Sequence, residues 1–196
     1  HRRKGMVVFR QSVRLSGMNE IPLRYGCNPH QVPASVGLPD PAPLRILNGS
    51  PSYINILDAL GAWQLARELK RATGVPGAAS FKHTSPAGAA IDRPLDGRFL
   101  ESQFFKPKER SPVARAYVRA RGGDRMCSYG DVAGVSERVD ETLANVLRTE
   151  VSDLIIAPGY EPEALDILKS KKRGGFLVIE VDPGYEPPAL ETREIY

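Results

Sequence analysis

The chain has 196 residues, 41% of them hydrophobic and 26% charged, a composition typical of a globular protein that buries a substantial core. Its formal net charge of +4 permits an anionic substrate without requiring one. No stretch is apolar enough to span a bilayer and the two cysteines lie far apart, which predicts a cytoplasmic protein with no membrane partner, disulfide scaffold or metal site.

Residues 1–22 end at Ile21-Pro22, and we expect them to be a linker or a remnant of an upstream region. Residues 1–14 carry five Arg or Lys and no acid. A nucleic-acid-binding protein would also need aromatic residues among the basic ones or a known binding motif, and neither is present. We therefore expect no nucleic-acid partner. Salt-dependent oligonucleotide binding that is lost with residues 1–14 would favour that alternative.

Residues 23–31 form the first polar cluster, and Arg24 and Tyr25 are its candidate binding residues. A guanidinium can hold a phosphate through two hydrogen bonds, and the tyrosine adds a flat face with a hydroxyl. A polar surface loop is the alternative. The proline-rich residues 33–43 then predict an extended surface connection.

Residues 44–47 predict a short strand that ends in a turn at Asn48-Gly49, and a helix should follow. Ser50 or Ser52 can cap this helix, and Gly74 and Pro76 end it. Its expected apolar face comprises Ile54, Leu57, Leu60, Leu65 and Leu69, with Trp63 packing at one edge. Asn48 is a candidate binding residue because the free amides of a helix N-terminus can receive an anion, although simple capping explains the pattern equally well.

The dipeptide Lys82-His83 follows a small-residue strand predicted over residues 78–81. An imidazole can accept a proton near neutral pH, and an adjacent ammonium can stabilise developing negative charge. Neighbouring side chains on a strand point to opposite faces, so both can serve one substrate only where the strand ends. We expect residues 85–88 to provide that break, at the carboxyl edge of the sheet. A surface pair is the alternative, and His30 and the terminal His1 are weaker candidates for the base.

The segment 91–110 shows no clear period and predicts an irregular loop. A helix should begin at Ser111-Pro112 and run to Arg121, ended by Gly122-Gly123. Residues 126–135 predict a strand that is interrupted at 129–131. Gly130 would let a ligand approach the main chain there, and a structural bulge is the alternative.

The last part of the chain predicts a helix from Asp140 to about Arg148, a buried strand over 154–157, a helix over 162–172 and a strand over 176–181. Asp153, just before the buried strand, could accept hydrogen bonds from an amino or ribose group; a cap or turn is the alternative. Residues 183–196 should fray. The alternation of strands and helices predicts an α/β layered fold with a mixed sheet flanked by helices.

Six segments of the chain, taken in order, closely resemble the transformylase domain of the bifunctional enzymes that join AICAR formyltransferase to IMP cyclohydrolase. These segments are LRYGCNPHQ (23–31), LNGSPSYINILDAL (47–60), AWQLARELK (62–70), SFKHTSPAGAA (80–90), ARGGDRMCSYGD (120–131) and EVSDLIIAPGYEPEAL (150–165).

The resemblance implies transfer of a formyl group from the cosubstrate 10-formyltetrahydrofolate to the 5-amino group of AICAR, giving FAICAR. In the family's Lys-His pair the His accepts the proton and the Lys stabilises the transition state, which places these roles on His83 and Lys82. The matching motifs place nucleotide binding on Arg24, Tyr25, His83, Gly130 and Asp153, with Asn48 as an additional candidate. The resemblance further implies a cytidine-deaminase-like layered sandwich without zinc or another metal, and a homodimer.

The chain also departs from this family. Residues 91–110 match poorly, nothing matches the cyclohydrolase domain, and the second domain of the transformylase, which supplies most folate contacts, is not within the sequence. We therefore expect residues 23–182 to form the first transformylase subdomain. A module that binds AICAR or a related purine nucleotide without turnover, or that pairs with another subunit, is the alternative.

Overall fold

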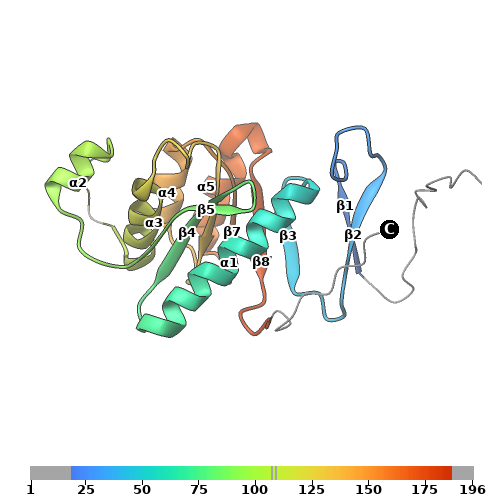
Figure 1. Cartoon of the computed structure of the whole chain (residues 1–196), viewed down its shortest axis with the longest axis horizontal. Coiled ribbons are helices and arrows are strands. Elements are labelled where there is room, and N and C mark those ends of the chain that lie inside the picture. Colours follow the sequence, from blue (N-terminus) through green and yellow to red (C-terminus); the bar gives the residue numbers. More distant parts are fainter. Residues whose placement is uncertain (1–18, 107, 109, 187–196) are drawn as a thin grey trace, which may run out of the picture.

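A six-stranded mixed sheet lies between two layers of helices, with a two-stranded ribbon beside it (Figure 1). The structure is a computed structural model that describes residues 19–106, 108 and 110–186. This architecture confirms the predicted α/β class; the narrower cytidine-deaminase-like classification stays a prediction.

The strands and helices follow one another along the chain. In order they are β1 (Asn19–Leu23), β2 (Ala34–Leu38), β3 (Leu44–Asn48), α1 (Tyr53–Thr73), β4 (Gly77–Lys82), β5 (Ser85–Ile91), α2 (Gly97–Ser102), α3 (Pro112–Gly123), β6 (Asp131–Val135), α4 (Glu141–Thr149), β7 (Ser152–Ala157), α5 (Pro162–Ser170), the 3₁₀ turn η1 (Lys171–Gly174) and β8 (Leu177–Val181).

Two apolar cores lie on the two faces of the sheet, because successive strand residues point to opposite sides. Ala78 packs with α3, α4 and α5 on one face, whereas Ala79 packs with α1 on the other. Trp63 is 2% exposed within the core beneath α1, which confirms its predicted place in the core. Small strand residues allow the helices to approach closely on both sides.

The order of the main sheet is β3-β8-β7-β6-β4-β5. Strands β6, β7 and β8 run parallel to one another, whereas β4 runs antiparallel to β6, with Phe81 opposite Val132. The carboxyl end of β4 therefore lies beside the amino ends of β6 and β7. The expectation that the site would lie at the carboxyl edge of the sheet is therefore wrong. Active sites lie at the carboxyl ends of strands in sheets whose strands are parallel, whereas β4 runs opposite to β6, β7 and β8.

Helix α1 has the predicted ends but a different buried face. Ser52 caps it and Gly74 closes it in a left-handed conformation, with φ of 74°. The expected stripe is correct only in part: Leu60 and Leu65 are partly buried against the core, whereas Ile54 is 37% exposed. The fully buried apolar residues are Ile56, Ala59, Ala62, Trp63 and Ala66. The cause is close packing, since a Cβ added to Gly134 on β6 would come within 2.5 Å of the Ala62 backbone. Only small helix residues fit this contact.

Several local expectations need correction. Residues 19–22 belong to β1, and the proline-rich segment contributes β2, because the two pair over their full lengths; residues 1–18 lie outside the described part. The segment 85–88, expected to break the strand, instead belongs to β5. Residues 126–130 form turns, so that only the second half of the strand expected over 126–135 exists. The short helix α2 lies within the expected loop 91–110.

The remaining helices and strands confirm the pattern-based predictions within a few residues. Ser111 caps α3, which starts with Pro112, and Asp140 caps α4. The fraying expected for 183–196 concerns residues that mostly lie outside the described part, although Arg67 on α1 donates a hydrogen bond to the Tyr185 carbonyl at 2.8 Å. No helix in the described ranges is long and apolar enough to cross a membrane.

Candidate active site

Lys82 and His83 lie at the tight turn between β4 and β5. Lys82 pairs with Ser85, so that His83 and Thr84 are the two turn residues, with φ of 54° and 62°. Two successive positive φ values are those of a two-residue hairpin turn that matches the strand twist. The break that frees His83 from the pleat is thus the His83-Thr84 turn itself. His83 is exposed and Lys82 half-buried at the rim of the sheet.

The Lys82 ammonium lies against the loop before β6. It donates a hydrogen bond to the Tyr129 carbonyl, and a Cβ added to Gly130 would lie 3.9 Å from Lys82 Nζ. Gly130 has a φ of 76° and donates its amide to the Val151 carbonyl at 2.9 Å. An ammonium has three N–H donors, so two remain for a substrate. The structure therefore brings Lys82 and Gly130 together, as both assignments require.

A buried charge network holds this loop from beneath. Arg121, 2% exposed, bonds the fully buried Asp131 at 2.7 Å and Glu150 at 3.0 Å. Ser80 on β4 donates to Asp131 at 2.7 Å, and the Tyr117 hydroxyl lies 3.1 Å from it. Burial raises the pKa of Asp131, while Arg121 and the hydroxyl donors oppose that shift. The network fixes the ends of β4 and β6 relative to α3.

Asp58 on α1 is a site residue that the sequence analysis did not single out. It is 5% exposed, and its carboxylate accepts the Thr84 amide at 2.6 Å, which ties α1 to the turn that carries His83. Burial raises the pKa of Asp58, and the backbone amides of Thr84 and His83 act against that shift. The available signal was an aspartate on a helix between two apolar residues, Leu57 and Ala59.

Arg24 and Tyr25 lie beside the start of α1. The Arg24 amide donates to the Pro51 carbonyl at 2.9 Å, and its guanidinium donates to Asn55 Oδ1 at 3.1 Å and lies 5.5 Å from the Tyr25 ring. Asn55 and Asp58 are three residues apart and therefore share one side of the helix. Arg24 and the His83 turn thus contact neighbouring positions of α1.

Asp153 lies at the amino end of β7, close enough to Asp58 to raise the pKa of that carboxyl. It is exposed and accepts a hydrogen bond from Lys172 Nζ at 2.7 Å. Lys172, with a φ of 53°, is a second residue that the sequence analysis missed. A ligand that binds Asp153 must share it with this ammonium or displace it.

Asn48 lies at the same edge of the sheet and connects two strands through hydrogen bonds. Its amide nitrogen donates to the Gly174 carbonyl at 2.9 Å and to the Phe176 carbonyl at 2.6 Å. Both N–H donors are therefore used to join the end of β3 to the start of β8, and its Oδ1 is the atom left for a ligand. This observation favours the capping or structural alternative for Asn48 over a donor role.

The seven predicted residues thus lie toward one edge of the sheet, and Arg24 and the His83 turn contact the first turns of α1 through Asn55 and Asp58. His30 lies in the exposed loop after β1, and His1 falls outside the described residues. Within the described ranges, no group of three or more His, Cys, Asp or Glu side chains is arranged to hold a metal ion. This edge carries an imidazole, an ammonium and a guanidinium, groups that can accept a proton, stabilise negative charge and bind an anion.

Comparison with known proteins relates most of the chain to one family of enzymes. The family model described as AICARFT/IMPCHase bienzyme matches residues 2–196. A protein of Chloroflexus aurantiacus is 36% identical over 152 residues, covering 77% of this chain and 26% of that protein. One of Myxococcus xanthus is 33% identical over 157 residues, covering 76% and 26%. One of Trichodesmium erythraeum is 30% identical over 164 residues, covering 81% and 28%.

All three relatives are bifunctional purine biosynthesis proteins named PurH. The chain spans 26–28% of their lengths.

Proposed function

The chain belongs to the AICARFT/IMPCHase bienzyme family, and on this premise we propose that it supplies the AICAR-binding and catalytic residues of a formyltransferase in purine biosynthesis. The reaction moves the formyl group of 10-formyltetrahydrofolate to the 5-amino group of AICAR. The observation that carries the proposal is the convergence of Lys82, His83, Gly130 and Asp153 at one sheet edge. Arg24 contacts Asn55 on α1, one helical turn from the Asp58 that binds the His83 turn.

The AICAR amine is a poor nucleophile because its lone pair is delocalised into the imidazole carboxamide. His83 accepts the proton that the amine loses as its nitrogen bonds to the formyl carbon. Lys82 stabilises the negative charge that develops on the formyl oxygen. The bond from that carbon to N10 of the folate then breaks, and N10 takes up a proton, which completes the transfer.

Nucleotide binding falls to the residues around α1. The Arg24 guanidinium, next to the N-terminus of the helix, suits a phosphate, because positive charge and free amides converge there. Asp153 suits an amino or ribose donor, and the main chain at Gly130 can lie close to the ligand. Only the resemblance to the family supports the folate cosubstrate and a second subunit as parts of this proposal.

Calorimetry tests binding first. AICAR should bind the chain, and Arg24→Ala should weaken that binding by about tenfold, since a charge-assisted phosphate contact is lost. Lys169→Ala, which removes an exposed cation of α5, is the control and should leave it unchanged. If Arg24→Ala binds AICAR as tightly as the parent chain does, Arg24 does not bind the phosphate.

Formyl transfer is then measured with the chain alone and with the remaining part of a PurH relative supplied as a separate polypeptide. We expect His83→Asn to reduce transfer by about 10²–10⁴-fold, the range for a lost general base. AICAR binding without any transfer under either condition would favour the binding-module alternative. Transfer that persists at the full rate in His83→Asn would exclude His83 as the base.

A further inference from the structure

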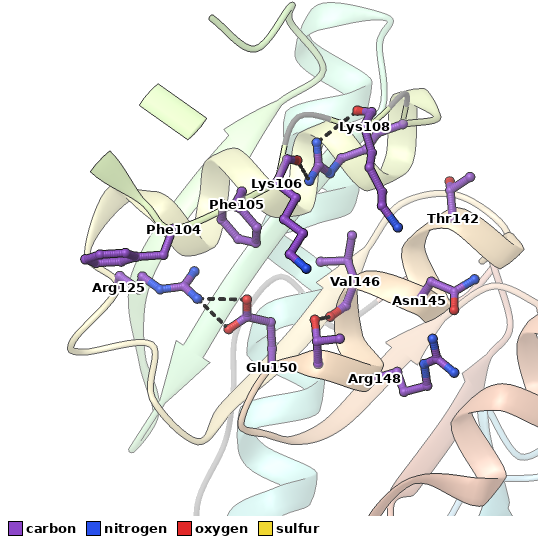
Figure 2. Close-up of a pocket in the computed structure, with 12 residues that line it drawn as sticks. Phe104, Phe105, Lys106, Lys108, Arg125, Thr142, Asn145, Val146, Arg148 and Glu150 are labelled. Carbon is purple, nitrogen blue, oxygen red and sulfur yellow. Dashed lines mark hydrogen bonds and ion pairs between the residues drawn. The ribbon is translucent and has the colours of Figure 1, made fainter. Parts of the chain in front are cut away.

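A hollow of about 760 Å³ lies between residues 104–106, 108 and 110 on one side and helix α4 on the other, apart from the candidate active site (Figure 2). None of the seven predicted site residues lines it. Its lining includes five cationic side chains and one carboxylate, namely Lys106, Lys108, Arg110, Arg125, Arg148 and Glu150. Figure 2 shows Lys106 and Lys108 extending from one wall toward α4, which carries Arg148.

Glu150, the one carboxylate among the described residues that line the hollow, is already engaged. Glu150 pairs with the buried Arg121 at 3.0 Å and with Arg125 at 2.8 Å. Lys106, Lys108 and Arg148 make no ion pair with a carboxylate of the described residues. The described residues that line the hollow therefore carry an excess of positive charge, and a concave wall concentrates that field on a ligand that enters.

Arg110 makes this a built site rather than a cluster of surface lysines. It is 8% exposed, and its guanidinium donates to the carbonyls of Lys106 at 2.8 Å and Lys108 at 3.0 Å, so it fixes the backbone from which both lysines extend. Its Nε is buried and makes no hydrogen bond to the described part of the chain, and the same holds for Nη1 of Arg125. Burial lowers the pKa of Arg110, because it removes water from around the guanidinium charge.

An exposed aromatic ring completes the lining. Phe104 is 84% exposed, and its φ of 58° is unusual for a bulky residue. The neighbouring Phe105 is buried, with its ring 4.6 Å from the Arg125 guanidinium. A flat apolar face next to a cationic hollow suits a ligand that carries a base at one end and several negative charges at the other.

We propose that this hollow binds a nucleoside triphosphate, whose phosphates contact Lys106, Lys108 and Arg148 and whose base stacks on Phe104. The volume lies within the range of small-molecule sites, about 300–1,000 Å³. Phosphate oxygens supply the anions that the lysines and Arg148 lack, and a single phosphate would contact only part of this charge. The proposal is independent of formyl transfer, since the two sites share no residue.

Calorimetry with ATP, AMP and inorganic triphosphate in metal-free buffer tests the proposal on the intact chain. ATP should bind most tightly, triphosphate less tightly and AMP at least about tenfold more weakly than ATP. The double variant Lys106→Ala with Arg148→Ala should weaken ATP binding by about tenfold or more. The control pair Arg98→Ala with Lys169→Ala removes the same charge from exposed positions outside the hollow and should leave ATP binding unchanged.

Phe104→Ala should reduce ATP affinity to that of triphosphate while leaving triphosphate binding unaltered. Each of these variants should still bind AICAR like the parent chain, which separates this site from the proposed active site. Absence of ATP binding, equal binding of AMP, or ATP binding that survives the double variant would overturn the proposal. A single-stranded oligonucleotide that binds more tightly than ATP would reassign the hollow to nucleic acid and also overturn it.

Discussion

The carboxylate of Asp58 and the amide of Thr84, 2.6 Å apart, join helix α1 to the turn that carries His83. Burial raises the folded-state pKa of Asp58 above its ordinary value of 3.8. The folded protein therefore binds this proton more tightly than the unfolded chain does. The resulting stabilisation is complete below the unfolded pKa and is lost as the pH rises through the folded pKa.

Asp58→Asn removes this titratable group. As the pH rises from about 4, the unfolding free energy of the parent should therefore fall relative to that of the variant. Urea unfolding of both proteins at several pH values between about 4 and 7 measures it. A difference that stays constant, or that shifts in favour of the parent, would contradict the raised pKa.

Thr84→Gly should stabilise the fold by about 0.5–1 kcal/mol, because a β-branched residue is strained at a φ of 62° and glycine is not. The backbone donor to Asp58 is retained in this variant. Thr149→Gly, at the end of α4, should instead destabilise by a similar amount, since glycine is a poor helix former. Thermal and urea unfolding of the pair check the opposite signs; a loss of stability at both positions would refute the strain.

Gly134→Ala should be strongly destabilising, by about 2 kcal/mol or more, since the added Cβ would lie 2.5 Å from the Ala62 backbone and must push α1 away from the sheet. Because α1 carries Asn55 and Asp58, AICAR affinity should fall too. Gly97→Ala, where nothing lies within 4 Å of the added atom, is the control and should be neutral or slightly stabilising. Equal effects of the two substitutions on the midpoint of urea unfolding would refute this packing.

Arg121→Met should cost about 3–5 kcal/mol, because it leaves the buried Asp131 and Glu150 without their cation. Arg45→Met breaks the ion pair with Glu180 at the surface, where the Arg45 side chain is 71% exposed, and should change stability by less than about 1 kcal/mol. Chemical unfolding distinguishes the two. A loss for Arg121→Met no greater than that for Arg45→Met would show that the network contributes little.

Lys82→Gln should lower the rate of formyl transfer by about 10²–10³-fold, the magnitude expected when one oxyanion-stabilising donor is removed. AICAR affinity should change by less than about threefold, because the role assigned to the ammonium develops in the transition state. Lys169→Gln is the matched control. Single-turnover kinetics and calorimetry separate the two effects, and an equal loss in binding and rate would assign Lys82 to substrate binding instead.

Local patterns predicted much of this fold. Capping residues located the starts of three helices, at Ser52, Ser111 and Asp140, since a cap acts within one turn. The buried strands β7 and β8 followed from short apolar runs. The ribbon β1-β2 was missed because both strands are short, β1 contains Pro22 and prolines flank β2. Its stability comes from the pairing between the two segments.

The candidate site was predictable in its chemistry but not in its arrangement. Lys82, His83 and Gly130 were proposed from residue type and motif, and the structure places Lys82 beside Gly130. Asp58 was missed because a charged residue in a helical pattern normally indicates the solvent side, whereas this carboxylate meets two backbone amides. Lys172 was missed because its contact with Asp153 spans 19 residues and a kinked turn.

The sequence by itself determined the local elements and the reactive groups, because hydrogen bonds within a turn, apolar periodicity and side-chain chemistry act over a few residues. Tertiary structure decided which of those groups meet. The reversed direction of β4 beside β6, the tight packing of α1 on Gly134 and the buried bond between Asp58 and Thr84 all depend on contacts between distant segments. Those contacts form only when the sheet and its helices pack together and exclude water. They therefore cannot be predicted from the spacing of residues along the sequence.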